Sequence, residues 1–99
     1  MQLSVEDIIN IVVNKIRKQL PSDDWQIYLF GSQAIGNAVD TSDIDIAIKG
    51  KNKIPWKKYI EIRQIPEEIS TLRHIDIVDL GRGGDLLQEA VLKNGKLLS

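Results

Sequence analysis

The chain has 99 residues and no cysteine, which excludes disulfides and thiolate metal sites. Its hydrophobic share of 42% and charged share of 27% are those of an ordinary globular chain, so we expect one domain over residues 1–99. Thirteen basic and fourteen acidic residues give a net charge of -1, so no direct nucleic-acid binding is expected.

The first predicted element is an amphipathic helix over residues 4–20. Ser4 followed by Asp7 predicts a capping box at its start, and Pro21 ends it. Its apolar residues recur at helical spacing, which predicts a helix with one buried side. They form a single stripe of Val5, Ile8, Ile9, Val12, Val13, Ile16 and Leu20.

Two strands are predicted next, over residues 25–30 and 43–49. The first is rich in aromatic and β-favouring residues and stops at Gly31-Ser32, after which a short helical turn is expected over 33–37. The second alternates with the two-residue period of a strand that buries one face. Ile44, Ile46 and Ile48 share one side, and Asp43, Asp45, Ala47 and Lys49 share the other.

The second half of the chain continues the alternation of helix and strand. A helix is expected over residues 55–65, and Pro66 starts a short second piece that reaches about Leu72. A third strand is predicted over 74–80 and a last helix over 85–94.

The last predicted helix carries signals at both ends. Asp85 with Gln88 predicts a capping pattern at its start, and Gly95 is a stop signal at its end. Strands that alternate with helices indicate an α/β fold, with helices flanking a three-stranded sheet. The link between the first two strands is too short for a full crossover helix, so we expect a small mixed sheet.

Two further features of the sequence bear on where the protein is located in the cell. No apolar run approaches the roughly 18 residues of a membrane span. No basic or apolar leader segment precedes the first predicted helix. We therefore expect no membrane contact and a cytoplasmic location.

Two carboxylates, Asp43 and Asp45, project from one face of the second predicted strand, because residues i and i+2 share a side. Aspartate is depleted in strands and neighbouring carboxylates repel each other, so a bound cation would stabilise the pair. Oxygen ligands of this kind suit Mg²⁺. Two Mg²⁺ ions about 4 Å apart could share them and clamp the attacking and leaving oxygens of a phosphoryl transfer.

Gly31-Ser32 and Asp76 complete the candidate site. Gly31 leaves room for a phosphate near the backbone, the turn exposes N–H donors, and the Ser32 hydroxyl can donate to a phosphate oxygen. Asp76, on the next strand, would bind the catalytic metal and accept the proton of an incoming hydroxyl. Asp79 has the opposite parity, so both cannot face one site, and Asp76 is preferred because its apolar neighbours face the core.

Each of these signals is weak when taken alone. An Asp-x-Asp strand is a solvated face roughly half of the time, and a Gly-Ser turn is commonplace. When these signals occur together, each in the strand context that it requires, the probability that they are purely structural falls to about one in ten. His74 is expected at an exposed strand edge, and Trp25, Trp56 and Tyr28 in the core or at its rim.

The joint pattern resembles a known family. Gly31-Ser32, followed after ten residues by the Asp-Ile-Asp of 43–45, is similar to the signature of the DNA polymerase beta-type nucleotidyltransferase superfamily. It closely resembles the minimal, stand-alone (MNT) branch of that superfamily. Residues 75–80 resemble the third-acid strand of this branch, whose first aspartate, here Asp76, is a metal ligand. The resemblance covers essentially the whole chain.

The resemblance implies a nucleotidyltransferase fold and transfer of a nucleoside monophosphate from a nucleoside triphosphate, with ATP favoured, to a hydroxyl. It implies two Mg²⁺ ions held by Asp43, Asp45 and Asp76 as catalytic residues, with Gly31 and Ser32 joining the first two in nucleotide binding. In toxin–antitoxin pairs of this branch, the transferase is the antitoxin and adenylylates a tyrosine of a HEPN-domain ribonuclease. A HEPN-domain protein is therefore the expected partner, in a hetero-oligomer.

The chain departs from that family at three positions. Members commonly carry arginines where this chain has Gln33 and Ile35, and often an acid at Asn37. Losing two positive charges beside the phosphates weakens triphosphate binding or transition-state stabilisation. A second function therefore stays open beside the active transferase: a nucleotide-binding module with little catalysis that neutralises its partner by forming a complex.

A third possibility is transfer to a small molecule. A chain of 99 residues has no room for a separate acceptor domain, which argues against it. The acceptor site is then completed by another protein or a second copy of the chain. Exposed apolar positions such as Ile11 or Ile62 would serve such contacts.

Overall fold

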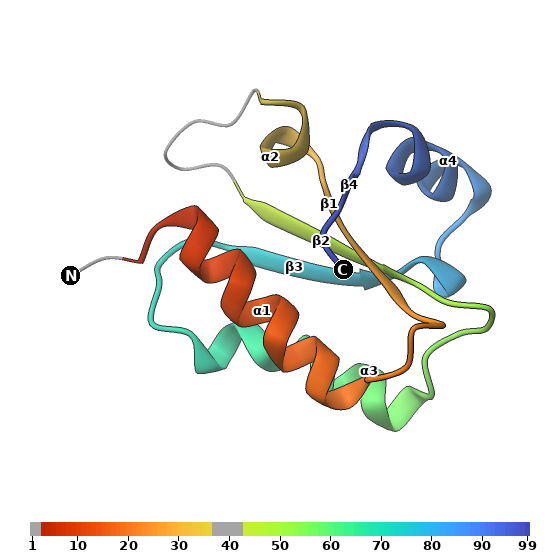
Figure 1. The fold of residues 1–99 in the computed structure, drawn as a ribbon, viewed down its shortest axis with the longest axis horizontal. Helices are drawn as coiled ribbons and strands as arrows, with labels where there is room; N and C mark the ends of the chain where they lie inside the picture. Colours follow the sequence, from red (N-terminus) through yellow and green to blue (C-terminus); the bar gives the residue numbers. More distant parts are fainter. Residues whose placement is uncertain (1–2, 37–42) are drawn as a thin grey trace.

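The computed structural model describes residues 3–36 and 43–99, so Asn37, expected at the end of the short helical turn, lies outside the described residues. No helix within these ranges is both long and apolar enough to cross a membrane. The elements run in the order α1 (Val5–Gln19), β1 (Gln26–Phe30), α2 (Ser32–Ile35), β2 (Ile44–Lys49), α3 (Trp56–Arg63), η1 (Ile65–Glu68), β3 (Ile75–Asp79), η2 (Leu80–Arg82), α4 (Asp85–Asn94) and β4 (Lys96–Leu97) (Figure 1).

The strands form one mixed sheet in the order β3-β2-β1-β4. β1 is antiparallel to both β2 and β4, whereas β2 is parallel to β3. The predicted mixed α/β sheet is confirmed, but the expectation of three strands is wrong, because Lys96–Leu97 adds a fourth. Two residues are too few to show a periodic pattern, and they pair with β1 only because α4 returns the chain to the sheet.

One side of the sheet is the apolar side. The isoleucines of β2 and β3 point to it together with Ile27 and Leu29 of β1, and all of them are buried. Helices α1 and α3 lie together against this side (Figure 1). Their buried residues complete the main core: Ile8, Val12, Ile16, Tyr59 and Ile62. Burying an aliphatic side chain of this size stabilises the fold by about 1.5–3 kcal/mol.

The predicted start of α1 is confirmed. The Asp7 amide donates to Ser4 Oγ at 3.0 Å, and the Ser4 amide donates to Asp7 Oδ2 at 3.3 Å, which closes the capping box. The expectation that Ile11 and Ile62 are exposed is wrong. Ile11 packs partly buried against the core, and Ile62 lies on the side of α3 that faces the sheet, where it is fully buried.

The other side of the sheet carries the polar residues of β2 and is covered in part by α4. Val91 of α4 packs with Ala47 and Leu80, and with partly buried Tyr28 and Phe30 of β1. Ala47, predicted on the polar side, does face away from the isoleucines but is buried beneath α4. Helix α2 packs against β1 and β2, and its Ala34 contacts the main core.

Two predicted boundaries differ from the structure. The N-cap of α4 is Gly84, with no side-chain cap, so the predicted capping pattern at Asp85 and Gln88 is wrong. Asp85 already lies inside the helix, and the Gln88 side-chain Nε2 instead donates to the Leu80 carbonyl at 2.8 Å. The piece that Pro66 was expected to open is the short 3₁₀ helix η1, which ends at Glu68.

Candidate active site

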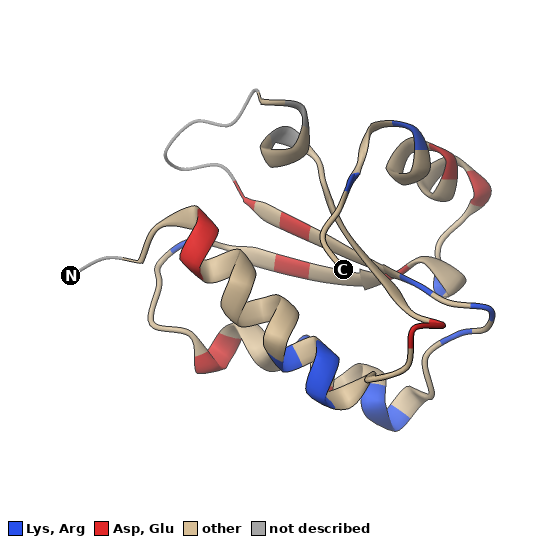
Figure 2. Cartoon of the chain, in the orientation of Figure 1, with Lys and Arg blue, Asp and Glu red and all other residues tan. Residues whose placement is uncertain are grey.

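The parallel pairing of β2 with β3 brings two of the three predicted acids side by side. Asp45 is the register partner of Asp76, and partners in a parallel pair project from the same side of the sheet. Both are partly buried, and both point away from the isoleucine side. Asp43 directly precedes β2 with the parity of Asp45 and is exposed. Figure 2 shows acidic positions, in red, on the adjacent strands β2 and β3.

The glycine of the predicted turn lies directly against Asp45. β1 ends at Phe30, the register partner of Asp45, and Gly31 follows with a φ of 74°. A Cβ atom placed on Gly31 would lie 2.5 Å from Asp45 Oδ2. Ser32 then opens α2. The structure therefore places Gly31 directly against Asp45.

The acids form one electrostatic cluster. Burial raises the pKa of Asp45 above its ordinary value of 3.8, and the charges of Asp76 and Asp43 raise it further. His74, which is exposed as predicted, acts in the opposite direction. Burial and the neighbouring charges therefore disfavour the ionised form of Asp45, and a cation bound beside the acids would stabilise it.

Asp79 faces the opposite side of the sheet from Asp76, as its parity predicted. Its carboxylate is buried and accepts hydrogen bonds from the amides of Ile54, at 2.8 Å, and Gly81, at 2.9 Å. It also pairs with the guanidinium of Arg82. All these contacts are structural, since they tie the start of α3 and the turn after β3 to the end of that strand.

Arg63 is a residue of this site that sequence reasoning missed. Its Nη2 atom lies 3.7 Å from Asp76 Oδ1, and the guanidinium is 5.7 Å from the centre of the Tyr59 ring. Arg63 is the last residue of α3, which packs on the isoleucine side. No local pattern marks it, because its contact with Asp76 depends on how α3 lies along the edge strand β3.

The donor set fits a hard divalent cation with phosphate ligands. Carboxylate oxygens lie on one side of the sheet, beside a glycine whose missing Cβ leaves space above Asp45. Asp43, Asp45 and Asp76 are the residues that would hold the ion. As the side chains stand, no group of three or more acidic, histidine or cysteine residues within 3–36 and 43–99 is close enough to enclose a metal.

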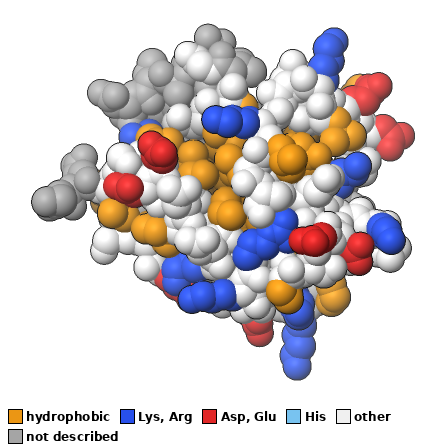
Figure 3. All heavy atoms as spheres, viewed as in Figure 1, with side chains coloured by type: hydrophobic (Ala, Val, Ile, Leu, Met, Phe, Trp, Pro, Cys, Tyr) orange, Lys and Arg blue, Asp and Glu red, His pale blue; other side chains and the backbone are white. Residues whose placement is uncertain are grey.

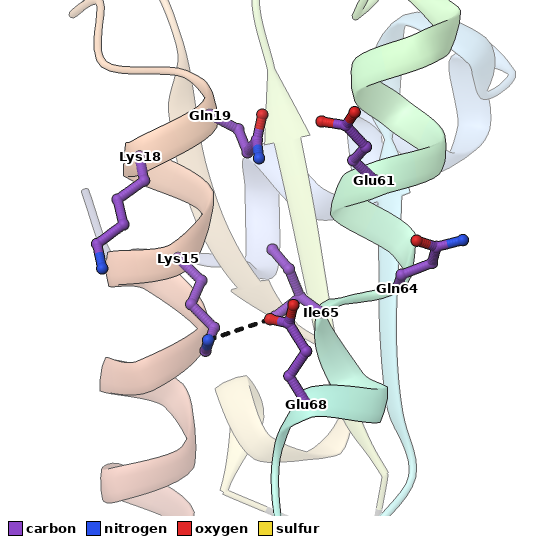
Figure 4. A pocket seen from close by; sticks show the side chains of 7 residues that line it. All are labelled: Lys15, Lys18, Gln19, Glu61, Gln64, Ile65 and Glu68. Carbon is purple, nitrogen blue, oxygen red and sulfur yellow. Dashed lines mark ion pairs between the residues drawn. The ribbon is translucent and has the colours of Figure 1, made fainter.

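A groove elsewhere on the molecule is distinct from the acids. It lies between α1 and the α3–η1 segment, on the apolar side of the sheet, and contains an ion pair of 3.1 Å between Lys15 and Glu68 (Figure 4). Its lining mixes both charges: Lys15, Lys18, Gln19, Glu61, Gln64, Ile65 and Glu68. Its position separates it from Asp45 and Asp76 by the thickness of the sheet.

A mixed sheet that presents carboxylates from two parallel strands beside a glycine turn is typical of an enzyme of phosphoryl transfer. The family model described as polymerase beta, nucleotidyltransferase matches residues 7–99. The chain therefore belongs to the polymerase beta nucleotidyltransferase family. Comparison with curated protein sequences gave no match.

Solved structures of toxin–antitoxin complexes are similar to this chain. A chain in a toxin–antitoxin structure with AMP-PNP has a TM-score of 0.67 at 28% identity, covering 89% of this chain and 70% of that chain. A mutant MntA-HpeT complex gives 0.64 at 30%, covering 87% and 71%. A structure of the tri-AMPylated Shewanella oneidensis HEPN toxin with MNT antitoxin gives 0.60 at 29%, covering 91% and 71%.

Replacing Gly31 with alanine is expected to impair nucleotide binding, and Gly36→Ala provides a matched control. Both glycines have a positive φ, 74° and 78°, so alanine costs each about 1–2 kcal/mol of stability. Only at Gly31 would the new methyl group displace the Asp45 carboxylate, because nothing lies within 4 Å at Gly36. We expect at least a roughly tenfold weaker Mn²⁺–ATP affinity for Gly31→Ala alone, measured by calorimetry. Equal affinities of the two variants would contradict this.

We expect the stability of the metal-free protein to depend on pH through Asp45. Its raised pKa means that the folded chain binds this proton more tightly than the unfolded chain does. The stabilisation is fully present below pH 3.8 and is lost as the pH rises through the raised value. In EDTA, Asp45→Asn should therefore melt at a higher temperature than the wild type at neutral pH, with the gap closing on acidification. The exposed Asp23→Asn control should show no such gap.

Proposed function

We propose that this chain is an Mg²⁺-dependent adenylyltransferase that acts as an antitoxin by transferring AMP from ATP to a tyrosine hydroxyl of a HEPN-domain toxin. The observation that carries the proposal is the placement of Asp45 and Asp76 side by side, with the Gly31 turn against Asp45. The similarity to structures that contain AMP-PNP or an AMPylated HEPN toxin supports the choice of nucleotide and acceptor.

The reaction assigns a task to each part of the site. The turn at Gly31 and Ser32 binds the triphosphate through backbone N–H groups. Mg²⁺, when bound by the carboxylates, neutralises phosphate charge and activates the α-phosphate. The acceptor oxygen forms a bond to the α-phosphorus, the bond from that phosphorus to the β-phosphate oxygen breaks, and pyrophosphate leaves. Asp76 accepts the proton of the acceptor hydroxyl.

Gln33 is a polar residue in the first turn of α2. Its Nε2 atom is buried and has no hydrogen-bond partner among residues 3–36 and 43–99. A buried N–H donor without a partner costs about 1–3 kcal/mol, which a phosphate oxygen could offset. This neutral donor would supply a hydrogen bond, but not the positive charge that the family commonly places at this position.

A partner has exposed apolar side chains available to it. One face of the molecule leaves hydrophobic side chains uncovered among charged ones (Figure 3). Within the described ranges, the large apolar residues with most of their surface exposed are Trp56, at 64%, Leu72, at 104%, Leu86, at 83%, and Leu97, at 54%. These residues, rather than Ile11 and Ile62, are suited to bury surface against another protein.

The test is transfer of label from α-³²P-ATP to a purified HEPN-domain toxin with Mg²⁺ present. Labelled toxin, with the label on tyrosine and absent in EDTA, is the expected result. Absence of label, with the complex of the two proteins shown to form, would reject the transferase and leave a binding role.

The alternative function is neutralisation by complex formation with little catalysis. The absence of any basic residue from Ser32 to Ile35 favours it, because the triphosphate then lacks a cation on α2. The double substitution of Asp43 and Asp45 by asparagine separates the two functions in cells. If this variant still binds the toxin but no longer protects growth, formation of the complex alone does not explain the antitoxin effect.

A further inference from the structure

The candidate site runs across the sheet from β1 to β3. Gly31 follows β1, Asp45 lies on β2, and Asp76 lies on the edge strand β3. Adjacent strands lie about 4.8 Å apart. With the triphosphate on the Gly31 turn, the acceptor hydroxyl must approach from the β3 side, where Asp76 faces it.

Arg63 stands at this acceptor side. It is the last residue of α3, which lies on the isoleucine side of the sheet (Figure 1). Its Nη2 atom is 3.7 Å from Asp76 Oδ1 on the edge strand β3. A hydroxyl that donates to Asp76 Oδ1 at about 2.8 Å would lie no more than about 6.5 Å from Arg63 Nη2. A long, flexible side chain can close that gap.

The contacts that Arg63 makes within the described part of the chain leave its guanidinium N–H donors without a hydrogen-bond acceptor. The contact with Asp76 is a single one of 3.7 Å between half-exposed groups, and such surface pairs contribute little to stability. Arg63 makes no hydrogen bond to any residue in the described part of the chain. Five N–H donors therefore remain for a substrate, while the face of Tyr59, which is buried, limits where the guanidinium lies.

We propose that Arg63 is a catalytic residue of the acceptor side: it donates to the acceptor oxygen and stabilises the negative charge that develops as the proton passes to Asp76. This inference rests on the proposed transferase function. A cation beside a developing oxyanion lowers the barrier to transfer. This role concerns the acceptor, so it does not require Arg63 to contribute to nucleotide or metal binding.

Arg63→Gln tests the inference, with Arg63→Lys and Lys57→Gln as matched variants. Lys57 is an exposed cation of the same helix, so its change removes equal charge away from the acids. We expect kcat for transfer to the HEPN-domain toxin to fall about tenfold in Arg63→Gln, with partial recovery in Arg63→Lys and none lost in Lys57→Gln. The affinity for Mn²⁺–ATP, measured by calorimetry, should stay equal or become tighter.

A second measurement separates a role on the acceptor oxygen from a structural one. Fluorinated tyrosine at the acceptor position of the toxin needs less help to lose its proton, so the deficit of Arg63→Gln should shrink. A deficit that is the same for both tyrosines, or a matching loss of nucleotide affinity, would overturn the inference. If the wild-type protein transfers nothing, the proposed function itself fails; if both proteins transfer equally, only the role of Arg63 fails.

Discussion

Asp45→Asn is expected to slow AMP transfer about a thousandfold while the chain still folds. Asp45 lies against Gly31 and is the register partner of Asp76, so its carboxylate lies between the proposed phosphate side and the proposed acceptor side of the site. The amide keeps the shape of the side chain but removes the negative charge that attracts the cation. Single-turnover transfer from labelled ATP to the toxin measures the loss.

Asp23→Asn is the matched control for this change. Asp23 is exposed before β1, at the opposite end of that strand from Gly31, so its loss should leave the transfer rate unaltered. Circular dichroism should show the same fold for both variants. A rate for Asp45→Asn within a few fold of the wild type would remove Asp45 from the proposed metal site.

Asp79→Ala is expected to lower the free energy of unfolding by about 3–5 kcal/mol. The substitution leaves the amides of Ile54 and Gly81 without their acceptor and removes the buried partner of the Arg82 guanidinium. Arg82 also packs over Tyr59, at 4.7 Å from the ring centre, so the damage should spread to the start of α3. Urea unfolding followed by circular dichroism measures the change.

Two further variants make this prediction specific. Asp79→Asn keeps one side-chain oxygen as an acceptor and should be less damaging than alanine. Glu89→Ala removes an exposed acid from α4 and should change the free energy of unfolding by no more than about 0.5 kcal/mol. A loss for Asp79→Ala as small as that of Glu89→Ala would show that the buried contacts do not stabilise the turn after β3.

The alternation of apolar and polar residues in β2 predicts which side of the sheet Asp45 faces. Because strand side chains alternate with a period of two, burying Ile44 and Ile46 forces Asp45 to the opposite side. The same rule separates Asp76 from Asp79 on β3. Likewise, the capping box of α1 follows from two residues three positions apart, because helix ends are local structures.

Contacts between segments that are far apart in the chain could not be predicted from the sequence. The pairing of Lys96–Leu97 with β1, the three donors that meet Asp79, and the reach of Arg63 to Asp76 all join parts of the chain that show no common pattern. Periodicity reports which side of an element is buried, but it does not report which elements become neighbours. Those contacts arise from how the helices pack across the sheet, which is a property of the folded chain and of no single segment.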